Sequence, residues 1–72
     1  MADMKTIGVY PLTNTAALLV HNIDYVKDRL LVSLNGNDPQ WYEIKTENID
    51  GYWESGFYFG GTFVMVADIL RV

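Results

Sequence analysis

The sequence has 72 residues, half of them hydrophobic, with a formal net charge of −4, one histidine and no cysteine. This length allows one domain at most. The lack of cysteine excludes disulfides and thiolate zinc sites, and His21 alone cannot form a metal site. Because a chain this short has a thin stability margin, we expect a dense core or self-association to stabilise it. We treat residues 1–72 as a single small domain and expect residues 1–4 to form a flexible tail.

The Lys and Arg residues are scattered along the chain. Nucleic-acid-binding proteins neutralise phosphates with a basic stripe, so direct nucleic-acid binding is not expected. The longest apolar runs, AALLV at 16–20 and FVMVA at 63–67, are far shorter than the roughly 20 residues of a membrane-spanning helix. The first residues also lack the basic and apolar regions of a signal peptide. We therefore expect a cytoplasmic protein without a membrane segment.

Short alternating segments separated by turn signals follow one another along the chain, which is typical of a small sandwich or barrel. The first is KTIGVY, which Pro11 ends, and the second is the apolar run AALLVH. LLVSLN then alternates regularly and leads into Asn35–Gly36, a pair that tolerates positive φ angles. The sequence therefore predicts a mostly β protein, with strands at 5–10, 16–21, 30–35, 40–46, 52–59 and 62–67.

A second interpretation applies to residues 14–34. Gly36 lies where a helix-terminating glycine would be expected, and short apolar runs do not separate strand from helix by periodicity alone. The alternative fold is therefore α+β, with one short helix within residues 14–34. Four aliphatic residues support it by recurring at helical spacings: Ile23, Val26, Leu30 and Leu34.

Aromatic residues are concentrated between positions 41 and 59. Successive side chains of a strand point to opposite faces, so these residues cannot all be buried. If Ile44 is in the core, then Tyr42 and Thr46 point inwards with it. The same alternation in the next strand predicts a core of Tyr42, Trp53, Phe57 and Phe59.

The remaining side chains of these two strands are expected to face outwards. A bulge at Gly56 would reverse the expected direction of residues 52–55. Without it, the outward side chains are Trp41, Glu43, Lys45, Tyr52, Glu54 and Tyr58.

Two antiparallel registers are considered for residues 41–46 and 52–59. One places Glu43 opposite Glu54, and like charges directly opposite each other are destabilising. The preferred register instead forms the pairs Lys45–Glu54, Trp41–Tyr58 and Tyr42–Phe57.

The sequence shows no arrangement of catalytic residues. Enzymes need a nucleophile with a base, an acid–base pair or a metal, and local spacing ties no serine or cysteine to His21. The pairs Asn35–Gly36 and Gly60–Gly61 lack the flanking residues of a phosphate-binding loop. We expect no enzyme activity, no cofactor and no bound metal.

The outward aromatic patch is the candidate site. Tyr and Trp dominate binding hot spots, and large exposed apolar patches usually mark a partner. The competing interpretation is that outward aromatics only stabilise the strands by cross-strand packing. We expect a protein partner or a second copy of the chain, and no small-molecule substrate, to contact Trp41, Tyr52, Tyr58, Glu43, Glu54 and Lys45.

The order VKDRLLVSLNG, WYEIK, YWESGFYF and ILRV resembles small SH3-like barrels, although Lys27–Asp28 replaces the usual Gly-Asp before the central strand. More narrowly, the sequence is similar to short uncharacterised proteins of Gram-positive bacteria and their phages or mobile elements. Those proteins end in an apolar-Arg-apolar triplet, here Leu70–Arg71–Val72. The resemblance covers roughly residues 16–72 and implies an antiparallel barrel of five to six short strands, with no assigned activity. A mobile-element origin would imply an alternative function, in which this acidic protein inhibits a host defence protein or a DNA-handling protein.

Overall fold

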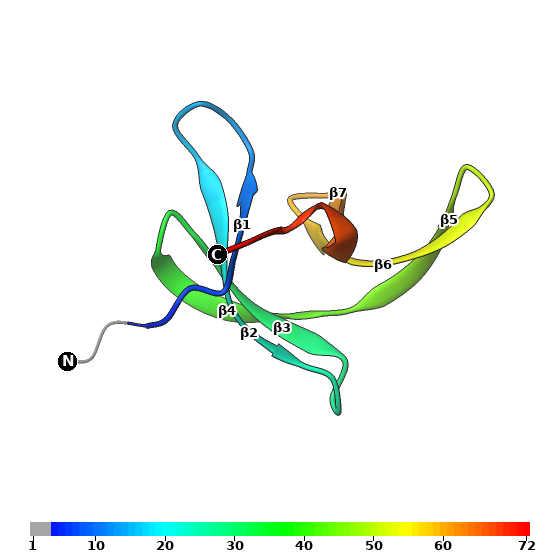
Figure 1. Cartoon of the computed structure of the whole chain (residues 1–72), viewed down its shortest axis with the longest axis horizontal. Helices are drawn as coiled ribbons and strands as arrows, with labels where there is room; N and C mark the ends of the chain where they lie inside the picture. Colours follow the sequence, from blue (N-terminus) through cyan, green and yellow to red (C-terminus); the bar gives the residue numbers. More distant parts are fainter. Residues whose placement is uncertain (1–3) are drawn as a thin grey trace.

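The computed structural model describes residues 4–72 as two antiparallel sheets (Figure 1). The five-stranded sheet has the order β4-β3-β2-β1-β8 and the three-stranded sheet the order β5-β6-β7. The predicted tail at residues 1–4 lies, apart from the exposed Met4, outside the described residues. The elements are β1 (Gly8–Pro11), β2 (Ala17–Asp24), β3 (Arg29–Leu34), β4 (Asn37–Glu43), β5 (Lys45–Ile49), β6 (Tyr52–Phe59), β7 (Thr62–Met65), the 3-10 turn η1 (Val66–Asp68) and β8 (Leu70–Arg71).

The prediction of a mostly β protein is confirmed, and the alternative of a helix within residues 14–34 is wrong. β2 and β3 form an antiparallel pair in which Val20 lies opposite Val32. The Asn35–Gly36 pair then closes a two-residue hairpin to β4, with φ angles of 55° and 87°. Positive φ at both central residues is what such a hairpin turn requires. The turn chemistry therefore outweighs the helical spacing of the preceding aliphatic residues.

The chain passes between the two sheets at two places. At the first, β4 continues into β5 through the single residue Ile44. At the second, η1 leads from β7 to β8. Within residues 4–72 no strand pairing joins the two sheets. The closed barrel is therefore not found, and eight strands replace the five to six that were expected.

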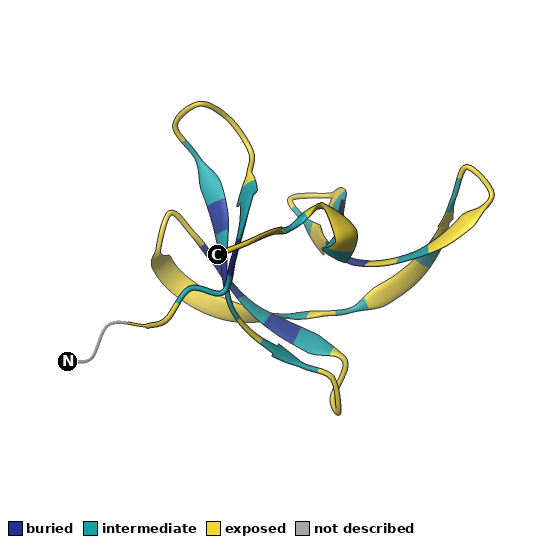
Figure 2. Cartoon of the chain, in the orientation of Figure 1, coloured by how far each residue is buried: buried dark blue, intermediate teal, exposed yellow. Residues whose placement is uncertain are grey.

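Both sheets contribute to one hydrophobic core (Figure 2). Tyr42, Phe57 and Phe59 belong to it as predicted, with the Tyr42 ring centroid 5.5 Å from that of Phe57 and 5.8 Å from that of Phe59. Ile44 also packs against the core, whereas Thr46 is exposed, contrary to the prediction. The fully buried hydrophobic side chains are Leu18, Val20, Leu30, Val32, Phe57 and Val64.

The prediction that Trp53 belongs to the core is wrong, because its side chain is 71% exposed. The pairing of β6 with both neighbours has no register shift at Gly56, so no bulge turns Trp53 outwards. Trp53 has the same parity as Phe57 and lies on the same face of β6. It is exposed because the β5–β6 hairpin extends beyond the other strands (Figure 1). The core covers one end of this face and leaves the other end in solvent.

The predicted register between residues 41–46 and 52–59 is also wrong. Lys45 lies opposite Gly56 and Ile49 opposite Tyr52, so the hairpin has a two-residue turn, Asp50–Gly51. Its φ angles of 51° and 90° are positive, as this turn requires. The expected pairs Lys45–Glu54 and Trp41–Tyr58 are not formed, and Tyr42 contacts Phe57 through the core rather than as a strand partner.

Candidate protein-interaction site

Three of the six predicted site residues lie along the bent strand formed by β4 and β5. Trp41, Glu43 and Lys45 are all exposed, as alternation predicts. The Lys45 Nζ atom lies 3.8 Å from Glu43 Oε2, so these two side chains form an ion pair at the bend. An exposed pair of this kind contributes about 1 kcal/mol or less. Its role is therefore to orient the charges more than to stabilise the fold.

The other three residues lie on the outer face of β6. The register places Tyr52, Glu54 and Tyr58 on the same face as Lys45, Glu47 and Ile49 of β5. We call these six residues, together with the tip residue Trp53, the hairpin surface. It is aromatic at the tip and carries two carboxylates in its middle, since Glu47 lies directly opposite Glu54.

Tyr58 and Glu47 are fixed to each other on this surface. The Tyr58 hydroxyl donates a hydrogen bond to Glu47 Oε2, and the Tyr58 ring packs at a centroid distance of 5.3 Å on Phe63 of β7. The hydrogen bond to the Glu47 carboxylate raises the pKa of the Tyr58 hydroxyl above its usual value. Glu47 was not among the predicted site residues, because the predicted strand ended at residue 46.

Trp41 is separated from the aromatic tip. It pairs with Leu31 in the five-stranded sheet, and the Arg29 guanidinium lies 4.0 Å from its ring centroid. Arg29 Nε is in turn 3.5 Å from Asp24 Oδ2. A cation over an indole face is a favourable contact. Trp41 is thus held in a chain of contacts with Arg29 and Asp24.

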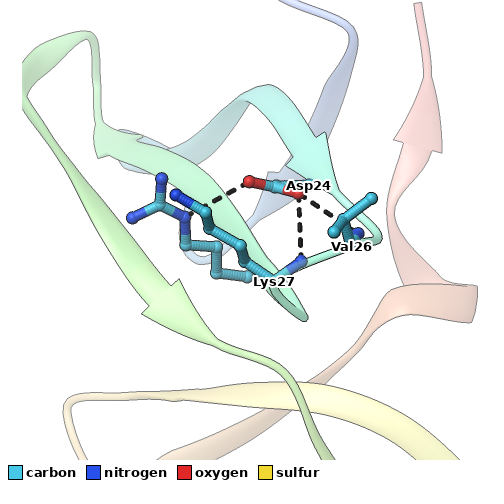
Figure 3. Close-up of polar contacts among 4 residues, drawn as sticks. Asp24, Val26 and Lys27 are labelled. Atoms are coloured by element: carbon cyan, nitrogen blue, oxygen red, sulfur yellow. Dashed lines mark hydrogen bonds and ion pairs between the residues drawn. The ribbon is translucent and has the colours of Figure 1, made fainter.

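The turn between β2 and β3 orients the Asp24 end of this chain (Figure 3). The Asp24 carboxylate accepts hydrogen bonds from the N–H groups of Val26 and Lys27, at 3.2 and 3.1 Å. The bond from Lys27, followed by those from Val26 and Arg29, lowers the pKa of Asp24 below its ordinary value despite partial desolvation. Asp24 is therefore a structural residue of the turn.

The tip of the β5–β6 hairpin exposes two large aromatic side chains side by side in sequence. Tyr52 is 75% exposed and Trp53 is 71% exposed, and they point to opposite faces of β6 because they are neighbours on a strand. Sequence reasoning found Tyr52 but assigned Trp53 to the core. The Asp50–Gly51 pair was the available signal, because an Asp-Gly pair between apolar residues is a strong two-residue hairpin signal.

His21 has a hydrogen-bond partner that local sequence spacing did not reveal. Its Nε2 atom is 2.7 Å from Ser33 Oγ on the neighbouring strand, and its Nδ1 atom is 2.8 Å from the Lys5 carbonyl oxygen. The distances are those of a nucleophile and its base. Ser33, however, is only 2% exposed, so a substrate cannot reach its hydroxyl. This arrangement ties the segment before β1 to the five-stranded sheet.

A small depression lies near β1, β8 and η1. Its empty volume is about 230 Å³, part of it open to solvent, and its lining is apolar except for Arg71. The space within it that a water-sized sphere can occupy is about 10 Å³, enough for about one water molecule, whereas typical ligand pockets have roughly 300–1,000 Å³. The described residues contain no group of three or more metal-ligating side chains, and no helix among them is long and apolar enough to cross a membrane.

Comparisons with known proteins give no relative from which a role could be assigned. No protein-family model, no curated protein and no solved structure matches the chain.

Proposed function

We propose that this protein is a non-catalytic protein-interaction module that binds its partner through the hairpin surface. The observation that carries the proposal is the exposure of Tyr52 and Trp53 on a hairpin that extends beyond the core. A small protein gains stability by burying such side chains, each of which can bury roughly 150–250 Å². Tyr52 and Trp53 remain in solvent at one tip, so the free protein does not gain this burial free energy. A partner surface that covered both side chains would gain it on binding.

The charge around the tip specifies the chemistry of the partner. Glu47, Asp50 and Glu54 lie close to the aromatic residues on β5, the turn and β6, whereas Lys45 is the one basic residue within 45–59. Interfaces commonly combine an aromatic centre with a polar rim, and complementary charge steers association. The partner surface is therefore basic around an apolar pocket.

The arrangement of His21 and Ser33 supports the non-catalytic part of the proposal. Both ring nitrogens of His21 are engaged, one by Ser33 and one by the Lys5 carbonyl. A catalytic Ser-His pair also engages both ring nitrogens of its histidine, but its serine hydroxyl must face a site that substrate can enter. The buried serine hydroxyl offers no such site.

The relation to SH3-like barrels and a cytoplasmic location remain parts of this proposal. The bent β4–β5 strand and the 3-10 turn before the last strand support the first. Inhibition of a host protein is a second candidate function. The acidic residues that surround the exposed tip favour it, because an inhibitor of a DNA-handling protein would meet a basic surface there.

Two measurements test the proposal. The first is light scattering behind a sizing column, over a range of concentrations, for the wild type and for a Tyr52→Ser, Trp53→Ser double variant. If the partner is a second copy, the wild type is a dimer and the double variant a monomer. If the partner is another protein, both are monomers, and the second measurement then decides whether the hairpin surface binds it.

The second measurement uses a photo-crosslinking amino acid at position 52 and, as a matched control, at Asn14, which is exposed in the turn between β1 and β2. We expect one defined crosslinked protein from position 52 and none from position 14. Losing a hot-spot pair lowers affinity by about 2 kcal/mol or more, so Trp53→Ser should remove the product. A monomer whose two positions give the same crosslinks would contradict the proposal.

A further inference from the structure

The outer edge of β5 is an open edge of the three-stranded sheet. Within residues 4–72, β5 pairs with β6 on one side only, so its other side presents main-chain groups that no described strand pairs with. Proteins usually protect such edges with proline, bulges, very short strands or charged side chains, and of these devices β5 has only the charged residues Lys45 and Glu47. The edge strand β4 contains Pro39 and pairs with a register shift, and β7 and β8 have four and two residues. β5 has five residues, no proline, and no register shift against β6.

The direction of the main-chain groups of β5 follows from its turn. Ile49 and Tyr52 close the two-residue turn and are the first and fourth residues of a β-turn, which are hydrogen-bonded to each other. Hydrogen-bonded and non-hydrogen-bonded pairs alternate in an antiparallel ladder. Thr46 and Asn48 therefore direct their N–H and C=O groups towards the free edge.

The free edge begins where β3 ends its contact with the bent strand. The Ile44 N–H donates to the Asp28 carbonyl oxygen at 2.8 Å, so the edge is occupied up to Ile44 and open from Lys45 onwards. The turn that contains Asp28 also carries Tyr25 and Val26, which are 71% and 93% exposed. The open edge thus runs from an apolar turn at one end to the aromatic tip at the other.

We infer that β5 accepts an extended segment of a partner protein as an additional antiparallel strand. The inference rests on the proposed function and deepens it, because it specifies how the partner engages the hairpin surface. In strand addition the main-chain hydrogen bonds provide affinity, and alternate side chains provide specificity. Thr46 and Asn48 would form the main-chain bonds, and the outer face of β5 would read the side chains.

The side chains on the outer face of β5 indicate which residues the added strand of the partner should carry. Side chains of the added strand would lie opposite Lys45, Glu47 and Ile49, on the face that also carries Glu54 and Tyr52. Lys45 already forms an ion pair with Glu43, so Glu47 is the charge that the added strand can match. Opposite charges and matched apolar side chains stabilise cross-strand pairs. In antiparallel direction this favours an aliphatic residue opposite Ile49, followed two residues later by a Lys or Arg opposite Glu47.

A second copy of the chain fits this edge poorly. β5 of one copy could pair with β5 of a second copy, antiparallel about a two-fold axis. If all five residues took part, Glu47 would lie opposite Glu47 of the second copy. Like charges directly opposite each other are destabilising. A basic segment of a different protein has no such conflict.

The test titrates the full-length protein with a six-residue peptide, acetyl-Thr-Ile-Thr-Arg-Thr-Thr-amide, and follows backbone amide signals by NMR. We expect the signals of Thr46 and Asn48 to shift most and their hydrogen exchange to slow. The matched control peptide carries Glu in place of Arg and should bind about threefold more weakly, as one surface ion pair would predict. In Glu47→Lys the preference between the two peptides should reverse.

Three outcomes would overturn the inference. The first is the absence of shifts at Thr46 and Asn48 at millimolar peptide, and the second is equal binding of the two peptides. The third is concentration-dependent broadening of these signals without peptide, which would place a second copy on the edge. Crosslinking from position 52 is a separate readout, so strand addition can fail while the hairpin surface still binds a partner.

A variant that blocks the edge provides an independent check. Thr46→Pro removes an N–H that faces the free edge and not β6, and proline is tolerated at such edge positions. A far-UV spectrum like that of the wild type would show that the variant folds. Retained amide shifts at Asn48 in the folded variant would contradict strand addition, and their loss would support it.

Discussion

At the residue scale, Phe57 and Trp53 show that strand parity and burial are separate properties. Both side chains lie on the same face of β6, yet Phe57 is fully buried and Trp53 is 71% exposed. Parity is set by the backbone and can be read from the sequence. Burial depends on what lies above each position, and that is decided by the length of the hairpin relative to the other sheet.

This difference predicts opposite results for two aromatic deletions. Phe57→Ala should lower the free energy of unfolding by about 3–5 kcal/mol, as expected for a large-to-small change in a core. Trp53→Ala should change it by about 1 kcal/mol or less, because exposed positions contribute little. Urea denaturation of both variants measures the two values. Similar losses in both would show that Trp53 is covered in the folded protein.

Asp24 predicts a pH dependence of stability. Its pKa is lowered in the folded state, chiefly by the Lys27 N–H, so its contribution is present above the unfolded pKa of about 3.9 and is lost as the pH falls through the folded pKa. The stability difference between wild type and Asp24→Asn should therefore be larger at pH 7 than at pH 2. Denaturation at both pH values measures it.

The matched control for this experiment is Asp68→Asn. Asp68 has no ion pair and no side-chain hydrogen bond within residues 4–72. Its substitution should give a smaller pH-dependent difference than that of Asp24. A difference for Asp24→Asn that stays constant with pH would contradict the role assigned to its carboxylate.

At the element scale, the Asp50–Gly51 turn decides the register of the β5–β6 hairpin. The predicted strand ended at residue 46 rather than at Ile49, and this shifted every expected cross-strand pair. The Asp50–Gly51 pair alone, taken as a two-residue hairpin turn, predicts the observed Ile49–Tyr52 pair. Most strands, the Asn35–Gly36 hairpin and the outward direction of Trp41, Glu43 and Lys45 could be predicted, because turn chemistry and alternation are local. The division into two sheets could not, because it depends on where the long strand bends.

The turn predicts the effect of removing its glycine. Gly51 has a φ of 90°, a conformation that alanine adopts with strain, so Gly51→Ala should lower the free energy of unfolding by about 1 kcal/mol or more. Hydrogen exchange should increase first at the tip of β5 and β6. Ser55→Ala, an exposed position of the same hairpin, is the control and should leave exchange unchanged. Equal exchange in both variants would argue against this turn as the determinant of the hairpin.

At the scale of the whole molecule, two sheets share one core and should unfold together. Phe57 and Val64 from the three-stranded sheet pack with Leu18, Val20 and their neighbours from the other. Small domains with one core usually unfold in a single cooperative transition. The candidate site lies where that core ends, and for this reason alternation in the sequence predicted an exposed Tyr52 but not an exposed Trp53.

The two tryptophans provide the test, because Trp41 lies in the five-stranded sheet and Trp53 in the three-stranded sheet. In Trp41→Phe the remaining fluorescence reports on the hairpin, and in Trp53→Phe it reports on β4. In each variant, the fluorescence transition should coincide with the circular dichroism transition of the same variant. A change in total stability caused by the substitution moves both transitions equally and does not affect this comparison. Separate midpoints would show that the hairpin unfolds on its own.

The passage of one strand through both sheets at Ile44 has a mechanical consequence. A partner that holds the hairpin and pulls along β5 applies tension to a continuous backbone whose other half is paired with β3. The tension acts along the strand direction, so the hydrogen bonds to β3 and to β6 are loaded in shear and must give way together. A pull across the strands at the Asp50–Gly51 tip would instead open the β5–β6 pairs one at a time. The same complex would therefore resist tension in one direction and release under tension in the other.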